Sequence, residues 1–200
     1  MPGVVQYMTE TLKTGLLAEC ANGYAEALVA FDKLVEGLSD AQANFKPTPK
    51  KWSINECIEH INISNRLYAA KLEAAIEKAR AAGKTGSEPY GRGTLMGRFI
   101  LNNLRQGAKA RKVPAPGKFK PVDSEHDQAR LSEEFRRYVN RLKELAEQAE
   151  GLPLGKLKFP TPVAPIGRVT AAQAFEMMRH HTQRHLGQAE RVKTAEGFPA

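Results

Sequence analysis

Residues 52–60 read Trp-Ser-Ile-Asn-Glu-Cys-Ile-Glu-His and predict the start of a long helix. Ser53 can accept a hydrogen bond from the backbone near Glu56, and the Glu56 side chain can reach back, which is a capping box. Apolar residues then recur every three or four positions until Gly83 closes the helix. His60 lies on the inward side of this pattern, so the stretch predicts a core helix that carries a histidine.

Three other segments show the same helical spacing of apolar residues. These predicted helices cover residues 9–37, 124–149 and 170–192. Thr170 and Gln173 form a second capping box at the start of the last one. Helix-forming residues fill most of the chain, and runs of valine, isoleucine and threonine are absent, so the composition predicts an all-α fold. Four long helices of this kind are typical of a four-helix bundle.

The segment 83–122, between the second and third predicted helices, has a different composition. It is rich in glycine and proline, with one short predicted helix from Thr94 to about Gln106. Nine basic residues oppose one acid, Glu88, in this segment: Lys84, Arg92, Arg98, Arg105, Lys109, Arg111, Lys112, Lys118 and Lys120. Nine minus one equals the formal charge of +8 for the whole chain, so the rest is neutral overall. We expect a long basic crossover within a single domain that covers residues 1–200.

The basic charge alone does not favour nucleic-acid binding, because it is confined to one segment and no recognition motif accompanies it. The segment is either a solvated loop or a basic entrance that attracts an anionic small molecule. No apolar run approaches the roughly 20 residues that span a bilayer, so no membrane partner is expected. Cys20 and Cys57 form no close-spaced motif and are interpreted as buried thiols of a cytoplasmic protein.

Residues 180–188 read His-His-Thr-Gln-Arg-His-Leu-Gly-Gln and carry the candidate chemistry. His181 and His185 stand four positions apart, so they share one helical face and can bind one metal ion together. His60, from another helix, would complete a three-histidine site that leaves positions open for water or substrate. Three polar rings in a helical core are costly unless a partner such as a divalent ion satisfies them.

Other residues are candidates for supporting this site. Glu56 could accept the second ring proton of His60, although a role in capping alone is the favoured interpretation. Gln188 could hydrogen-bond a bound water, and Arg184 could either orient the substrate or be a surface charge. Two further histidines are interpreted as residues outside the site: His126 and His180.

The pattern Trp-Ser-x-x-Glu-x-x-x-His at residues 52–60, followed by His-x-x-Arg-His-x-x-Gln at residues 181–188, resembles the DinB-like superfamily. The resemblance follows nearly the whole chain in order. It implies a four-helix bundle that binds a divalent metal ion through His60, His181 and His185. It also implies a metal-dependent transferase of a low-molecular-weight thiol, or a related enzyme, although many such proteins have no known activity.

Three classes of function remain open from the sequence, and nucleic-acid binding through residues 84–120 is the least favoured of them. In an enzyme, three neutral nitrogen ligands leave the charge of the ion uncompensated, so a bound water or thiol would lose its proton near neutral pH and act as the nucleophile. Zinc or nickel is the expected ion, because imidazole suits both. Thiol transfer is preferred over hydrolysis only through the resemblance. The alternative is a non-catalytic, metal-stabilised bundle that acts as a binding or stress-response module, and a homodimer is an open expectation for either class.

Overall fold

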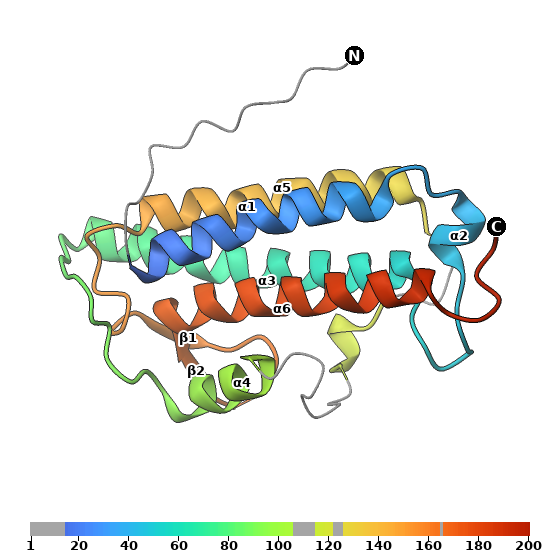
Figure 1. Cartoon of the computed structure of the whole chain (residues 1–200). Helices are drawn as coiled ribbons and strands as arrows, with labels where there is room; N and C mark the ends of the chain where they lie inside the picture. Colours follow the sequence, from blue (N-terminus) through green and yellow to red (C-terminus); the bar gives the residue numbers. More distant parts are fainter. Residues whose placement is uncertain (1–14, 106–114, 122–125, 165) are drawn as a thin grey trace, which may run out of the picture.

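The computed structural model describes residues 15–105, 115–121, 126–164 and 166–200. These residues form a mainly helical protein, as the composition predicts, with one small sheet in addition (Figure 1). The elements follow in this order: α1 Leu16–Val35, α2 Asp40–Asn44, α3 Ile54–Ala81, α4 Leu95–Arg105, η2 Gly117–Phe119, α5 Gln128–Gln148, β1 Lys158–Pro160, β2 Arg168–Thr170 and α6 Ala171–Lys193. Among the described residues, no helix combines the length and apolar character needed to traverse a lipid bilayer.

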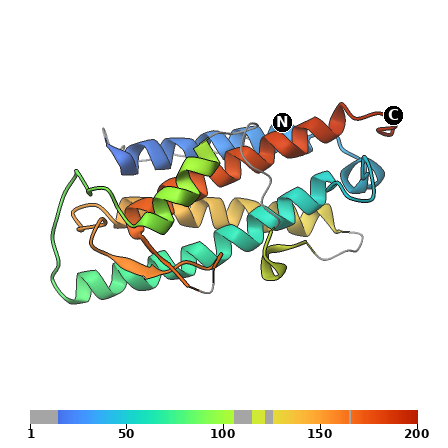
Figure 2. The ribbon, with the colours of Figure 1, turned by 90° about the horizontal axis from the view of Figure 1, so that it is seen from below.

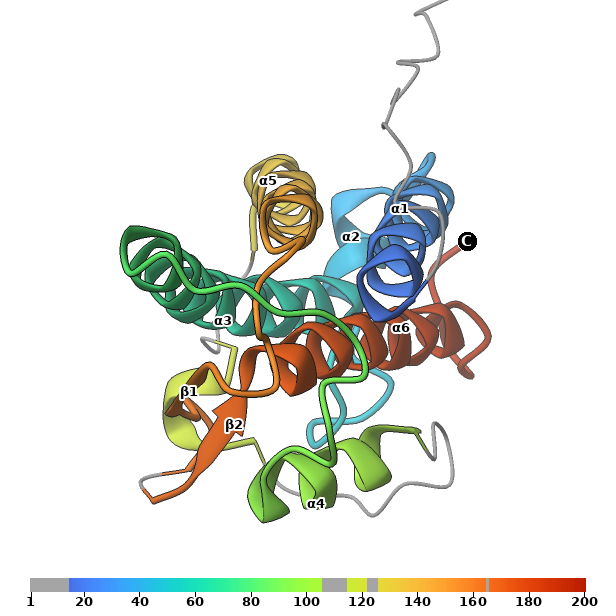
Figure 3. The same cartoon turned by 90° about the vertical axis from the view of Figure 1, so that its left-hand side faces the viewer.

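Four long helices, α1, α3, α5 and α6, lie side by side (Figures 1 and 3). Helices α1 and α3 each pack against both α5 and α6. Figure 1 shows that α1 and α6 run in one direction while α3 and α5 run in the other. Because α3 and α5 run in the same direction, the end of α3 and the start of α5 lie at opposite ends of the long helices, and α4 and η2 come between them in the sequence.

Aromatic side chains hold the long helices together in the core. The rings of Phe31 on α1 and Phe135 on α5 stack with their centroids 4.0 Å apart. Tyr24 is fully buried, and its hydroxyl donates a hydrogen bond to the carbonyl oxygen of Phe175 on α6, 2.7 Å away. Full burial of one such side chain contributes roughly 1.5–3 kcal/mol. The interior between α1, α5 and α6 is therefore packed with aromatic rings, and the buried hydroxyl of Tyr24 has a hydrogen-bond partner.

Both predicted capping boxes are present at the helix starts. The Ser53 side chain accepts from the backbone of Glu56 at 3.1 Å, and Thr170 accepts from the backbone of Gln173 at 3.1 Å. Each glutamate or glutamine side chain also accepts from the backbone amide of its partner. These caps satisfy amide groups that the first helical turn leaves without partners. They start α3 and α6 at the positions that the sequence predicts.

Helix α4 is attached to the start of α6 through a glutamine side chain. The Gln173 amide accepts from the backbone N–H of Thr94 at 3.0 Å and donates to the carbonyl oxygen of Thr94 at 3.1 Å. A Cβ atom at Gly97 would lie only 2.2 Å from this amide, so a larger residue would push the hydrogen-bonded side chain away. The same amide therefore caps α6 and holds α4 against it.

Strands β1 and β2 form an antiparallel pair just before α6 (Figures 1 and 3). Phe159 and Val169 are opposite each other, and both side chains face the interior. The glycines and prolines of residues 151–169 correctly predict the absence of a regular helix, but the strand pair is an addition to the all-α prediction. Strands of three residues are too short to show an alternating pattern in the sequence.

Candidate metal centre

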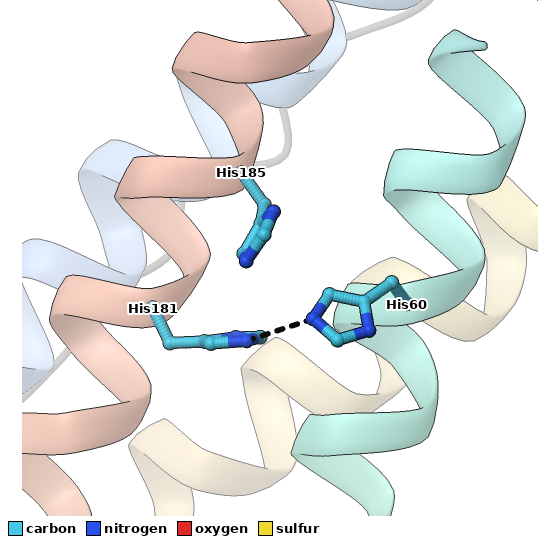
Figure 4. Close-up of side chains that lie close together, drawn as sticks. All are labelled: His60, His181 and His185. Atoms are coloured by element: carbon cyan, nitrogen blue, oxygen red, sulfur yellow. Dashed lines mark hydrogen bonds between the residues drawn. The ribbon is translucent and has the colours of Figure 1, made fainter. Parts of the chain in front are cut away.

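The structure brings together the three histidines that the sequence singles out. His60 projects from α3 toward α6, where His181 and His185 lie one turn apart (Figure 4). One nitrogen atom of each ring lies within 4.8 Å of the others. The ring centroids are 4.5 to 4.9 Å apart. Residues separated by more than a hundred positions thus form one compact cluster, which we call the histidine cluster.

Two of these rings are oriented by acceptors outside the cluster. His60 donates from Nδ1 to the carbonyl oxygen of Phe119, 2.6 Å away, and His185 donates from Nδ1 to Oε1 of Gln188, 3.0 Å away. Because both partners are oxygen acceptors, Nδ1 carries the proton in each neutral ring. Nε2 of His60 and of His185 therefore keeps a lone pair that can bind a cation.

The third ring lies within hydrogen-bonding distance of the first. Nε2 of His181 is 3.1 Å from Nε2 of His60 (Figure 4). Two lone pairs at this distance repel each other, so either a proton or a cation must lie between them. Nδ1 of His181 is buried, and no described residue hydrogen-bonds to it. A buried nitrogen without a partner is a costly feature that a functional site can account for.

The surroundings of the cluster favour neutral rings. Burial lowers the pKa of His60, although its hydrogen bond to Phe119 opposes the shift. Burial and the neighbouring histidines hold the pKa of His181 well below its ordinary value of 6.5. Burial, His60 and Arg184 lower the pKa of His185 to about 3. At neutral pH the three rings are therefore uncharged, which is the form that binds metal ions.

The residues fit a divalent ion such as zinc. Imidazole nitrogen binds zinc at about 2.0–2.1 Å, so two nitrogens on one tetrahedral ion are at most about 3.4 Å apart. The 3.1 Å separation between His60 and His181 is within that limit. The widest separation of 4.8 Å has to close by about 1.4 Å, so binding of the ion requires the histidine side chains to rotate toward one another.

Glu56 has the capping role that the sequence favours and not the alternative role of supporting His60. The Glu56 carboxylate accepts from the backbone N–H of Ser53 and from Nζ of Lys46, each at 2.7 Å. It therefore caps α3 and forms an ion pair, and the carbonyl of Phe119 takes the ring proton of His60 instead. The sequence suggests that Gln188 could hydrogen-bond a bound water. In the structure its Oε1 accepts a hydrogen bond from the His185 ring.

Trp52 contributes to the site in a way that its sequence position alone does not reveal. Its ring centroid lies 4.8 Å from that of His60 and 6.0 Å from that of His185. The sequence predicts only an apolar anchor directly before the cap of α3. The indole ring instead shields one side of the histidine cluster. The sequence signal for this role is that Trp52 directly precedes the cap of the helix that carries His60.

A cavity of about 430 Å³ opens beside the histidine cluster. All three histidines line it, together with mostly apolar side chains from α4, η2 and α6. Among the described residues that line it, Arg184 is the one with a permanent charge. Pockets that bind small molecules are typically about 300–1,000 Å³ and mostly apolar, with a few polar groups. The cavity therefore has the size and character of a small-molecule site.

The basic crossover contributes apolar groups to this cavity. Every described residue of segment 83–122 that lines the cavity is uncharged. Arg105 instead donates to Oε1 of Glu176 from Nε, 3.1 Å away. Lys109, Arg111 and Lys112 lie outside the described residues. In the part of segment 83–122 that the structure describes, no basic side chain is therefore among the residues that line the cavity.

The other two histidines considered lie outside the cluster. His180 is 3.7 Å from the carboxylate of Glu176 on the same helix. His126 is buried, with Nε2 3.6 Å from the carboxylate of Glu59. Within the described residues, the histidine cluster is the one grouping of histidine, cysteine and acidic side chains close enough to hold a metal ion.

Comparison with known proteins agrees with this arrangement. A sequence model described as the DinB superfamily matches residues 24–189, more than four fifths of the chain. The matched region contains all three residues of the histidine cluster and all four long helices, apart from the ends of α1 and α6. No curated protein and no solved structure matches the chain.

Proposed function

The chain belongs to the DinB superfamily, and from this we propose that it is a metal-dependent transferase that acts with a low-molecular-weight thiol, or a related hydrolase. One observation carries the proposal: three neutral imidazoles meet at the wall of a cavity that can hold a small molecule. We interpret the four packed helices as a four-helix bundle and residues 83–122 as its long crossover.

In this proposal His60, His181 and His185 hold a divalent ion, with zinc or nickel as the expected metal. When bound, such an ion supplies the positive charge that makes a thiol or water more acidic at neutral pH. The protein positions the ligands beforehand, because Phe119 and Gln188 set which ring nitrogens carry protons. This preparation supports tight binding, since such outer partners hold the ligand rings in place.

Other side chains would act on the substrate. Arg184 lies on the cavity wall between two of the histidines in sequence, so its charge can orient an anionic group. The apolar walls exclude water, which strengthens electrostatic interactions inside the site. The buried free thiols Cys20 and Cys57 are consistent with a reducing cytoplasm, and we propose that location for the protein.

The alternative function is a non-catalytic, metal-stabilised bundle that serves as a binding or stress-response module. Structural metal sites usually have a closed set of four protein ligands. Within the described residues the candidate cluster has three histidines and borders an open cavity. These two features favour the enzyme.

Elemental analysis of untagged protein, purified without a metal-affinity column, tests the proposal. We expect close to one ion per chain in the unchanged protein and in His180→Ala, whose ring lies outside the cluster. His185→Ala should lose most of the metal while it remains folded by circular dichroism. Equal metal content in the unchanged protein and in His185→Ala would contradict the site. A panel of electrophiles with different cellular thiols then separates an enzyme from a module, because only an enzyme accelerates thiol consumption.

A further inference from the structure

The cavity beside the histidine cluster has a continuous apolar wall. Met96, Ile100 and Leu104 line it from α4 and stand four residues apart, so they form one stripe along the helix. Met177 faces them from α6, and the buried ring of Phe119 closes the end next to His60. A ligand that fills this space must bring a hydrocarbon surface, because the wall offers few hydrogen-bonding partners.

The charges around the cavity have one sign. No aspartate or glutamate is among the described residues that line it, and Arg184 carries a permanent positive charge there. A divalent ion on three neutral histidines would add further positive charge. An anionic group on the ligand would stabilise both.

We propose that this cavity binds an amphipathic organic anion, a small molecule with a hydrocarbon body and a single carboxylate or comparable acidic group. The body lies along the stripe of Met96, Ile100 and Leu104, and the acidic group lies toward Arg184 and the histidine cluster. The inference rests on the proposed function, for which it names the class of substrate.

The volume of the cavity and its apolar wall determine how strongly binding affinity should depend on the chain length of the ligand. A cavity of about 430 Å³ is within the range of sites that hold small ligands. Each methylene transferred from water to an apolar wall contributes about 0.8 kcal/mol, and 1.4 kcal/mol is a tenfold change in affinity. Each added methylene should therefore tighten binding about fourfold until the cavity is filled.

Isothermal titration of the full chain tests this directly. The ligands are hexanoate, heptanoate and octanoate, with octanamide as the neutral partner of octanoate. Each is titrated into protein freed of metal with a chelator and into protein loaded with zinc. We expect affinity to rise with chain length in both forms, and we expect octanoate to bind at least tenfold more tightly than octanamide.

Two pairs of variants locate the bound molecule. Ile100→Gln should weaken octanoate binding and flatten the dependence on chain length. Leu95→Gln is its matched control, because Leu95 is on the same helix, 76% exposed and outside the cavity lining. Arg184→Gln should remove the preference for octanoate over octanamide, whereas Arg191→Gln on the same helix should keep it.

The outcomes separate the two proposals. A folded protein that binds zinc but shows no dependence on ligand chain length overturns the inference and leaves the proposed function standing. A protein that takes up no metal but still binds octanoate through Ile100 and Arg184 supports the cavity assignment and overturns the metal site. Equal effects of Ile100→Gln and Leu95→Gln would place the ligand elsewhere and overturn the inference.

Discussion

His60 donates its Nδ1 proton to the carbonyl oxygen of Phe119, 59 residues further along the chain and 2.6 Å away. The contact joins a long helix to η2 in the crossover. It leaves Nε2 of His60 unprotonated and directed toward His181, 3.1 Å away. Gln188, one turn further along α6, likewise accepts the Nδ1 proton of His185 and leaves Nε2 of that ring unprotonated. Two of the three candidate ligands are thus held in their metal-binding form by groups outside the histidine cluster.

Mutation can test whether Gln188 holds the His185 ring in its metal-binding orientation. We expect Gln188→Ala to weaken zinc binding about 10- to 100-fold, because partners of this kind hold the ligand ring in orientation. Gln188→Glu should retain most of the affinity, since a carboxylate can also accept the Nδ1 proton. Competition with a chromophoric chelator measures both. The neighbouring Glu190→Ala, at an exposed position on α6, is the control and should bind zinc as the unchanged protein does.

Trp52 is the only tryptophan of the chain and lies next to two of the three histidines. Its fluorescence should therefore report binding of a metal ion at the cluster. We expect copper or nickel, which have partly filled d shells, to quench the emission in a saturable manner. Zinc, with a filled shell, should change the spectrum without strong quenching.

The same titration on His185→Ala gives the control for Trp52. That variant should show no saturable quenching at stoichiometric metal. Equal quenching of both proteins would mean that the ions bind elsewhere.

Gln173 holds two elements with one amide group, and two substitutions can separate these roles. Gln173→Glu keeps an acceptor for the cap of α6 but removes the donor to Thr94. Gln173→Ala removes both interactions and should lower the free energy of unfolding by about 1 kcal/mol. Hydrogen exchange should be faster in α4 for both variants. It should be faster in the first turn of α6 only for Gln173→Ala.

Unchanged exchange of α4 in both Gln173 variants would show that the amide does not secure this helix. A thermal melt of each variant checks that the exchange differences come from local opening rather than from global unfolding.

The two cysteines should be unreactive in the folded protein. Burial raises the pKa of Cys20 to about 12, and burial also raises the pKa of Cys57. At pH 8 a thiol with a pKa of 12 is about one part in ten thousand thiolate, which is the reactive form. We expect no reaction with a disulfide reagent such as 5,5′-dithiobis(2-nitrobenzoate) in buffer, and two thiols per chain in denaturant. Rapid reaction of the native protein would contradict the buried positions.

Glu176 should make folding stability depend on pH. The nearby His180, followed by Arg105, lowers the pKa of Glu176 to about 2, below its ordinary value of 4.5. A carboxyl group whose pKa is lower in the folded state stabilises the fold above the unfolded pKa, and loses this effect as pH falls toward 2. We expect Glu176→Gln to lower the free energy of unfolding at pH 7 by ~0.2–1 kcal/mol.

The difference between Glu176→Gln and the unchanged protein should shrink in melts below pH 4.5. Glu133→Gln, at an exposed position on α5, is the control and should alter stability little at any pH. A Glu176 effect that stays constant between pH 7 and pH 3 would contradict the proposed charge interaction.

The parts of the molecule that were predictable from sequence are those with local signals. The caps at Ser53 and Thr170 mark helix starts because each uses a side chain three residues away. The histidine cluster was predictable because His181 and His185 share a helical face, and the family pattern supplies His60. The capping boxes and the spacing of His181 and His185 involve residues only three or four positions apart, so they can be recognised in a single sequence.

The remaining features depend on contacts between distant segments. The acceptor for His60 is a backbone carbonyl, which every residue has, so nothing in the sequence distinguishes Phe119 for that role. Lys46 forms an ion pair with Glu56 and lies in an irregular segment, whose path is set by tertiary packing. The short helix of the crossover was predictable, but its position against α6 depends on the Gln173 contact.

The candidate metal ligands and the apolar stripe of the cavity belong to different helices, and this has an evolutionary consequence. The candidate metal ligands belong to α3 and α6, whereas the apolar stripe beside them belongs to α4, which packs mainly on α6 and β2 (Figure 2). If the cavity binds a ligand as proposed, replacing residues on that stripe would change the shape of the ligand site while the three histidines stay in place. New ligand preferences could then arise, or be engineered, through substitutions in helix α4 alone, while the histidine cluster is inherited unchanged.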